Sequence, residues 1–392
     1  MFVSYTIVTY IYVTLKNASM ENPFVFGKTV GKTDFCNRSK DIEFMHHQFN
    51  TNANTILISP RRWGKSSLVE EAARRYHKDN VRFAYIDLFK CRTPEEFHEA
   101  YVHALLKATN SKMDEAFQFA NKWLKGILPY LSFQPDPNTE FSIKFQSNSA
   151  IKEDEIINLS QTIAVKKNVR IILCIDEFQN VNHFPHPIDF QKKLRSYWQR
   201  HDKVHYCLYG SKRHLMTQLF ESSDLPFYKF GSVHYLKKID EAEWIPFVIS
   251  KFKKTGKTIL GEQVTLVCRA MESHSYYTQN AFQILWYISS NKVKDSDVEQ
   301  ALIRLGEQNE LQFQKIVEGL TTYQLNFIKA VCKGVESLHS KKAIKDFSLG
   351  TTATIQRSIQ ALLQKDVIDV MGKEISIVDS AFKWWFIRNF MA

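Results

Sequence analysis

Hydrophobic runs alternate with helical patterns along the first half of the chain. Segments such as 67–78 place their apolar residues on one face of a helix. The runs between these segments predict four or five buried strands, at residues 54–59, 81–89, 169–176, 204–211 and 233–239. Strands rich in Val, Ile and Leu that alternate with helices predict an α/β fold, with a mostly parallel sheet and helices on both of its faces. Residues 105–150 are expected to form a longer helical segment that ends in a polar loop.

The pattern changes after residue 239. Residues 240–318 show only helical periodicity and predict a small helical domain. Residues 319–392 predict three short helices followed by two strands that turn at Gly372 and Lys373. Three helices and a hairpin are the outline of a winged helix. We therefore expect a core domain over 21–239, a helical domain over 240–318 and a winged helix over 319–392.

Composition places limits on the class of protein. The 392 residues are 44% hydrophobic and 24% charged, with a net charge of +11. These values are typical of a globular protein and exclude disordered, collagenous and polytopic membrane proteins. The positive charge favours acidic partners, namely nucleotide phosphate, nucleic acid or an anionic membrane, but does not choose among them.

The six cysteines are far apart and form no CxxC pair, so they indicate neither a zinc site nor a disulfide framework. A cytoplasmic location fits this usage best. The apolar stretch at residues 1–15 is shorter than the roughly 20 residues of a spanning helix, so no integral membrane role is expected. We interpret residues 1–19 as an upstream extension before a start at Met20; a membrane anchor is the alternative.

The most specific motif lies between the first predicted strand and the helix that follows it. A strand–loop–helix context supports a phosphate-binding loop, because the amides and the dipole of the helix N-terminus attract a phosphate. Lys65 would contact the β- and γ-phosphates, and the Ser66 hydroxyl would bind Mg²⁺. Ser59 replaces the usual first glycine; an ordinary turn before a helix is the alternative. The predicted nucleotide-binding residues are Ser59, Pro60, Arg61, Arg62, Trp63, Gly64, Lys65, Ser66 and Ser67.

A second motif, IILCIDE, is an apolar strand that ends in Asp176 and Glu177. Ligands of open parallel sheets bind at the carboxyl ends of the strands, where these acids would face the phosphate loop. Asp176 would hold Mg²⁺ through a bound water, and Glu177 would deprotonate the water that attacks ATP. The alternative is a pair of acids that cap the next turn. The two motifs together predict a site for ATP and Mg²⁺.

Several further stretches carry a family resemblance: PRRWGK, DEFQ, YGS, PFYKFGSVHYL and HSYYTQ. With them, residues 22–390 resemble the archaeal-type ATPases of the STAND branch of AAA-like P-loop proteins, which also occur in bacteria and carry a C-terminal winged helix. The resemblance implies a P-loop ATPase core, a helical lid and a winged-helix output.

The resemblance also implies roles for residues outside the two motifs. Phe35 and Arg38 would lie near the nucleotide, and Ser211 would be the sensor that contacts the γ-phosphate or the attacking water. Tyr277 and Gln279 would lie at the start of a lid helix that closes over the nucleotide. Core positions for the aromatic residues and a helix cap for Ser211 are the alternatives.

One departure from the family pattern concerns the cation that stabilises the transition state. Where relatives place an Arg after a proline, this chain has Lys229, which lacks the bidentate fork of a guanidinium. Either Arg213 or Lys229 substitutes for the arginine, or turnover is slow; we expect slow turnover.

These observations favour an ATP-driven switch whose winged helix reports the nucleotide state. A nucleotide-controlled DNA-binding regulator and a nucleotide-holding interaction protein that never hydrolyses are the alternatives. In the predicted recognition helix, Gln356, Arg357, Gln360 and Gln364 face outward, with Lys341, Lys342, Lys345 and Lys373 nearby. Protein partners and an oligomer are compatible with the same sequence.

Overall fold

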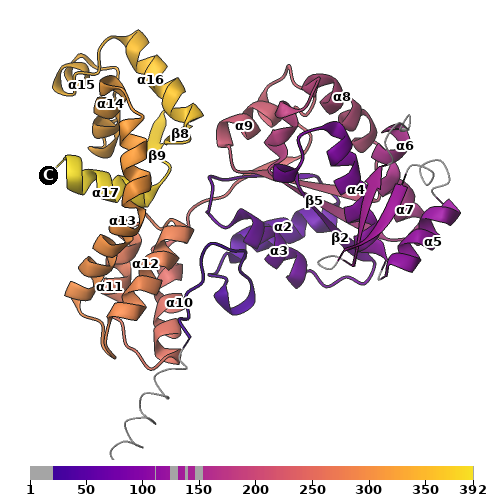
Figure 1. Ribbon diagram of the computed structural model, residues 1–392, viewed down its shortest axis with the longest axis horizontal. Coiled ribbons are helices and arrows are strands. Elements are labelled where there is room, and N and C mark those ends of the chain that lie inside the picture. Colours follow the sequence, from indigo (N-terminus) through magenta and orange to yellow (C-terminus); the bar gives the residue numbers. More distant parts are fainter. Residues whose placement is uncertain (1–20, 111, 124–130, 137–139, 146–152, 392) are drawn as a thin grey trace, which may run out of the picture. The chain divides into compact units, whose positions relative to one another are not determined.

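The computed structural model describes residues 21–110, 112–123, 131–136, 140–145 and 153–391 (Figure 1). The predicted extension at residues 1–19 lies outside these ranges. The chain divides into two compact units. One is Arg38–Lys237, and the other combines the chain before Arg38 with Lys238–Ala392.

The first unit is built on a sheet of five parallel strands in the order β2-β5-β6-β1-β7. Each strand coincides with a predicted apolar run, although β7 ends four residues before the predicted limit. The α/β prediction is thereby confirmed. The strands are β1 (Thr55–Ile58), β2 (Val81–Asp87), β5 (Arg170–Asp176), β6 (Val204–Gly210) and β7 (Ser232–Tyr235).

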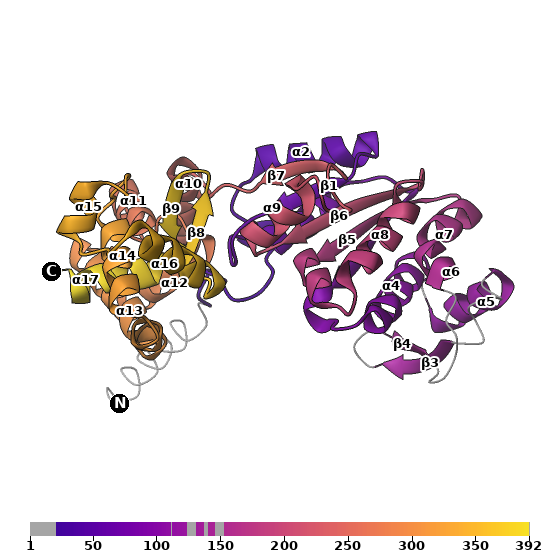
Figure 2. The same cartoon turned by 90° about the horizontal axis from the view of Figure 1, so that it is seen from above.

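Helices cover both faces of this sheet, as Figure 2 shows. On one face Phe49 of α2 packs edge-on against Phe83 and His205, and α3 lies beside α2. On the other face the buried strand residues form one core with Phe97, Leu194 and other side chains of the remaining helices. The helices are α2 (Ser39–Thr51), α3 (Lys65–Arg75), α4 (Pro94–Thr109), α5 (Met113–Trp123), α6 (Glu153–Ile157), α7 (Leu159–Lys167), α8 (Pro187–Trp198) and α9 (Arg213–Glu221). Burial on both faces explains why the strands read as continuous apolar runs.

The segment between β2 and β5 differs from its prediction. Residues 105–150 are not only helix and loop, because Leu131–Asp136 (β3) and Glu140–Phe145 (β4) pair as an antiparallel hairpin. The physical signal is an alternation of apolar and polar residues with a period of two in each strand. Pro135 obscured this alternation.

Between Glu241 and Glu318 the described secondary structure of the second unit is helical. Its first part contains α10 (Glu241–Lys254), α11 (Gly261–Ala270), α12 (Ser275–Ile288) and α13 (Asp295–Glu318). The winged helix follows: α14 (Thr322–Cys332), α15 (Lys341–Asp346), α16 (Thr352–Gln364), β8 (Ile368–Met371), β9 (Glu374–Ile377) and α17 (Ser380–Phe390). Met371 pairs with Glu374, so Gly372 and Lys373 form the predicted two-residue turn, and Gly372 supplies its positive φ of 61°.

One hydrophobic core joins the helical part to the winged helix. The segment before Arg38 belongs to the same unit, since Phe24 packs between Phe252 and Phe282 with ring centroids 5.5 and 5.6 Å apart. Lys251 donates to Asp34 at 2.7 Å and to the Pro23 carbonyl at 2.6 Å. These contacts hold residues 22–37 against α10 and α12.

Candidate nucleotide-binding site

The predicted phosphate loop connects β1 to α3. Gly64 is the N-cap of α3 with φ 92° and ψ 23°, a conformation that side-chain-bearing residues avoid. Nothing lies within 4 Å of the position where a Cβ would stand. Gly64 is therefore required by its backbone angle and leaves open space above the helix N-terminus, as an anion site needs.

Lys65 and Ser66, the first residues of α3, both reach the end of β5. Lys65 Nζ lies 2.9 Å from Asp176 Oδ1, and Ser66 Oγ donates to Asp176 Oδ2 at 2.6 Å. The Lys65 side chain is only 8% exposed, so its charge depends on this carboxylate. The ring of buried Tyr209 lies below the ammonium, 5.3 Å from it.

Glu177 is held by Ser211 and Gln179. Its Oε2 accepts hydrogen bonds from Ser211 Oγ at 2.7 Å, from Ser211 N at 3.2 Å and from Gln179 Nε2 at 2.5 Å. Its Oε1 lies 3.6 Å from Lys65 Nζ. The structure thus brings together five residues of the proposed chemistry: Lys65, Ser66, Asp176, Glu177 and Ser211.

The environment keeps Glu177 ionised. Burial alone would raise the pKa of Glu177, but the Lys65 ammonium and the hydrogen bonds from Gln179 and Ser211 outweigh it, so the pKa lies below its usual value. Its backbone is in the left-handed region, with φ 53° and ψ 42°. A left-handed non-glycine residue is strained, and such strain is concentrated at functional sites.

Arg38 holds the backbone of the phosphate loop in place. Its Nη2 donates to the Trp63 carbonyl at 2.9 Å, and its Nη1 donates to the Lys237 carbonyl at 2.9 Å and to Asp41 at 3.1 Å. The buried guanidinium therefore ties the loop to the chain that follows β7. In the structure, Arg38 contacts the backbone of the loop.

Arg213 and Lys229 are the two cations that could replace the arginine missing from the family pattern. The Arg213 guanidinium lies 5.9 Å from the centroid of the Trp63 ring, so it is next to the phosphate loop. The Lys229 ammonium lies 5.1 Å from the ring of its neighbour Tyr228. Of the two, Arg213 has the contact with a loop residue.

Three predicted residues belong to the second unit: Phe35, Tyr277 and Gln279. All are buried there. The Tyr277 hydroxyl donates to Asp379, which also caps α17 by accepting from Phe382 N at 2.9 Å. Tyr277 therefore joins α12 to the winged helix. The remaining loop residues divide by exposure: Ser59, Pro60 and Ser67 are buried, Trp63 is half-buried, and Arg61 and Arg62 are exposed.

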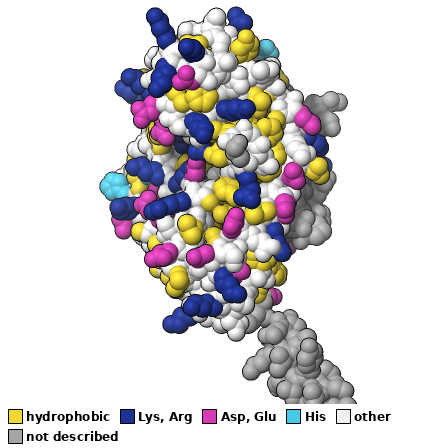
Figure 3. Space-filling model, turned by 90° about the vertical axis from the view of Figure 1, so that its left-hand side faces the viewer, with side chains coloured by type: hydrophobic (Ala, Val, Ile, Leu, Met, Phe, Trp, Pro, Cys, Tyr) yellow, Lys and Arg dark blue, Asp and Glu magenta, His cyan; other side chains and the backbone are white. Residues whose placement is uncertain are grey.

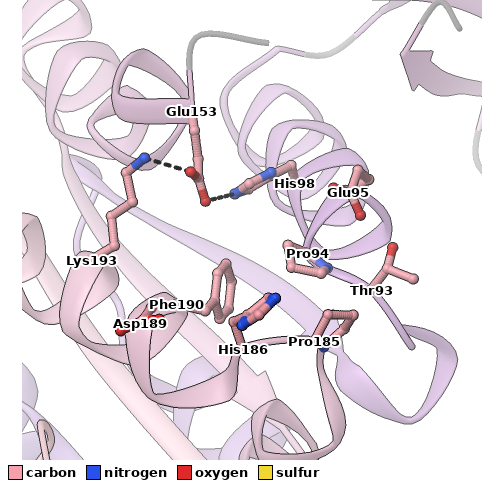
Figure 4. A pocket seen from close by; sticks show the side chains of 10 residues that line it. All are labelled: Thr93, Pro94, Glu95, His98, Glu153, Pro185, His186, Asp189, Phe190 and Lys193. Atoms are coloured by element: carbon pink, nitrogen blue, oxygen red, sulfur yellow. Dashed lines mark hydrogen bonds and ion pairs between the residues drawn. The ribbon is translucent and has the colours of Figure 1, made fainter. Parts of the chain in front are cut away.

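The first unit also contains a separate cavity of about 590 Å³ (Figure 4). None of the predicted site residues lines it. His98 in its wall is buried, which lowers the pKa of this imidazole to about 4, and Glu153 lies between His98 and Lys193. The lining residues are Thr93, Pro94, Glu95, His98, Glu153, Pro185, His186, Asp189, Phe190 and Lys193.

Sequence reasoning gave no role to Gln179 or Tyr209. Gln179 lies two positions after Glu177 and is the last residue of the DEFQ stretch that carries the family resemblance, which is the sequence signal for it. Its contact with Glu177 depends on the turn after β5, and the turn geometry is not encoded in periodicity.

Among the described residues, no helix is long and apolar enough to cross a membrane. The described part of the chain also has no group of three or more His, Cys, Asp and Glu arranged to hold a metal ion. The oxygens of Ser66 and Asp176 nevertheless fit Mg²⁺, which binds to few protein ligands when water and substrate phosphate supply the others.

Comparison with known proteins agrees with the fold. Residues 311–388 match the family model described as a probable winged helix domain. The Walker-type ATPase of Pyrococcus abyssi superposes with a TM-score of 0.65 at 13% identity, over 93% of this chain and 99% of that one. The chain has the fold of a Walker-type ATPase.

A second similar structure is the ORC2 protein of Aeropyrum pernix, in ADPNP–ADP complexes. It superposes with a TM-score of 0.54 at 12% identity, over 94% of this chain and 95% of that one. No curated protein matches the sequence. The expected architecture, a P-loop ATPase fold followed by helices and a winged helix, is thus confirmed, while identities this low identify the fold only.

Proposed function

We propose that the protein binds Mg-ATP at the phosphate loop and hydrolyses it. The observation that carries this proposal is the buried junction of α3 with β5, where Lys65 and Ser66 meet Asp176 at 2.9 and 2.6 Å. A buried lysine held by a carboxylate at a helix N-terminus can exchange that partner for phosphate oxygens. The ADPNP and ADP of the Aeropyrum pernix ORC2 structure indicate the same ligand class.

The residues divide the chemistry among them. Lys65 and the amides after Gly64 would bind the phosphates, and Ser66 and Asp176 would hold Mg²⁺. The metal ion, when bound, supplies positive charge that stabilises the phosphate oxygens during transfer. Glu177 would accept the proton of the attacking water at Oε1, since Oε2 is already occupied by three donors.

Arg213 is the proposed cation for the transition state. It starts α9 two residues after Ser211 and contacts Trp63 of the loop. Slow turnover remains our expectation, because no arginine follows the proline of the PFYKF element. Phe35, Tyr277 and Gln279 remain the proposed base and lid contacts. Hydrolysis would reopen the lid, and the winged helix would report the state.

The proposal is tested by titrating the purified protein with Mg-ATP in a calorimeter and measuring phosphate release. We expect Lys65→Ala to weaken ATP binding by at least about tenfold and Glu177→Gln to retain binding while phosphate release is lost. No heat with millimolar Mg-ATP on folded protein would refute nucleotide binding. If ATP binds but phosphate release does not exceed that of Lys65→Ala, the protein holds nucleotide without hydrolysing it.

A second candidate function is nucleotide-controlled binding of duplex DNA. The observation that favours it is the outer face of α16, where Gln356, Arg357, Gln360 and Gln364 are all exposed. Lys341, Lys342 and Lys345 on α15 and Lys373 in the turn are exposed as well. On the face of the second unit seen in Figure 3, however, Lys and Arg alternate with acidic and hydrophobic side chains rather than forming one basic patch.

The DNA hypothesis is tested by filter binding of a mixed-sequence duplex at several salt concentrations. Phosphate contacts predict an affinity that falls steeply with salt, and Arg357→Ala should reduce the slope by about one. No retention at low salt, with or without ATP, would dismiss DNA binding. A protein partner for the winged helix would then be the remaining output.

A further inference from the structure

We propose that Gln179 is a positioning residue for the acid–base group Glu177, and that Gly210 provides the space it needs. The proposal rests on the function proposed above. In this proposal, the hydrogen bond from Gln179 decides which carboxylate oxygen of Glu177 faces the attacking water. Neither residue binds nucleotide in this assignment.

The two carboxylate oxygens of Glu177 have different contacts. Gln179 Nε2, Ser211 Oγ and Ser211 N all donate to Oε2, at 2.5, 2.7 and 3.2 Å. Oε1 faces Lys65 Nζ at 3.6 Å. An oxygen that already accepts three hydrogen bonds is a poor proton acceptor, so Oε1 is the oxygen that remains for the proton of water.

Gly210, the last residue of β6, is what admits the Gln179 side chain. A Cβ at this position would lie 2.1 Å from Gln179 Oε1 and 2.6 Å from Met216 Sδ. Only glycine leaves that volume to the amide. The preceding residue, Phe178, is fully buried and packs against Phe220 and Phe227, which holds this part of the backbone in place.

A buried glutamine at position 179 is less favourable for stability than an apolar residue of similar size. The side chain is buried, and its Oε1 has no hydrogen-bond partner among the described residues. An unpaired buried carbonyl destabilises a protein, whereas an apolar residue of similar size would not. The bond to Glu177 is the interaction that distinguishes Gln179 from such a residue.

The test compares Gln179→Met with Gln191→Met. Gln191 is a matched control, because it is also buried, donates from Nε2 to Asn182 at 2.8 Å and has an Oε1 without a hydrogen-bond partner among the described residues. We expect Gln179→Met to lower kcat on the order of tenfold with KM nearly unchanged, because the carboxylate that accepts the proton is no longer held in position. Gln191→Met should leave both unchanged.

A second measurement needs no hydrolysis. The crystal structure of Gln179→Met is compared with that of the wild-type protein. In Gln179→Met the Glu177 carboxylate should leave its position, and Gly210→Ala, which displaces the amide, should have the same effect. A carboxylate that keeps Oε2 on Ser211 and Oε1 toward Lys65 in Gln179→Met would overturn the proposal even if the wild-type protein proves to be inactive. A displaced carboxylate in the variant, with no phosphate release by the wild-type protein, would count against the proposed hydrolysis alone.

Discussion

Each unit buries a lysine in an ion pair, but the two pairs have different uses. In Arg38–Lys237 the buried lysine Lys65 meets two successive acids at the end of one strand. In the second unit the buried lysine Lys251 pairs with Asp34, and the half-buried Glu272 pairs with Lys238 at 2.9 Å and with Lys383 at 2.5 Å. These pairs connect a helix or a loop to its neighbour.

The difference shows what makes a buried ion pair a site. A parallel sheet brings the carboxyl ends of its strands to one edge, so groups that are far apart in the sequence meet beside an open helix N-terminus. Helices packed on helices create no such edge, and their ion pairs fix orientation. The buried charge alone does not distinguish the two cases.

The largest effect is expected for Asp176→Ala. This substitution removes the partner of both Lys65 and Ser66, and it should lower phosphate release at least about 100-fold. The matched variant in the second unit is Asp34→Ala, which leaves Lys251 with the Pro23 carbonyl and should not change phosphate release. Equal losses of activity in the two variants would contradict the comparison.

Two glycines offer a second contrast. A Cβ on Gly231 would lie 2.3 Å from the backbone oxygen of Asn54, which cannot move without disturbing β1. Gly231→Ala should therefore destabilise the first unit by about 3 kcal/mol. Gly256 has φ 70° and open space around it, so Gly256→Ala should cost about 1 kcal/mol of backbone strain. Urea unfolding of the two variants measures both values.

Acid should destabilise the first unit selectively. The described histidines whose pKa is clearly lowered, His98, His201 and His205, all lie in it. Burial, together with Arg170, lowers the pKa of His205 to about 3. The unfolded chain binds the proton near pH 6.5, so stability falls as the pH drops from about 6.5 toward 3, by about 2 kcal/mol for this residue at pH 5.

Calorimetry at pH 8, 6 and 5 checks this expectation, with hydrogen exchange used to assign the unit that opens. His205→Gln should reduce the loss of stability between pH 8 and 5. If the variant loses as much as the wild type, His205 does not govern the acid response.

The smallest effect is expected for Tyr277→Phe in the second unit. The substitution removes the hydrogen bond to Asp379, which still caps α17, and should cost about 1 kcal/mol of stability. Because the ring is retained, the affinity for Mg-ATP should stay within about twofold. Thermal unfolding and calorimetry measure the two quantities, and a large loss of affinity without a loss of stability would show that the hydroxyl serves the nucleotide.

Much of the candidate site could be predicted from sequence because its signals are local. The strand before Ser59, the glycine at Gly64 and the acids after IILCI each follow a known physical pattern. The β3–β4 hairpin was missed, since Pro135 interrupts a short alternating pattern. The partners of Arg38 and Gln179 could not be predicted, because both contacts depend on how separate segments meet.

The sequence by itself determined the order of strands and helices along the chain, the phosphate loop and the two acids, because hydrophobic periodicity and backbone preference act over a few residues. Only the tertiary structure decided that Asp176 pairs with Lys65 and Ser66, that Glu177 is bound on one oxygen, and that Gly210 makes room for Gln179. These contacts join residues from different strands and helices, and the strand order that brings them together is fixed by packing of the whole sheet.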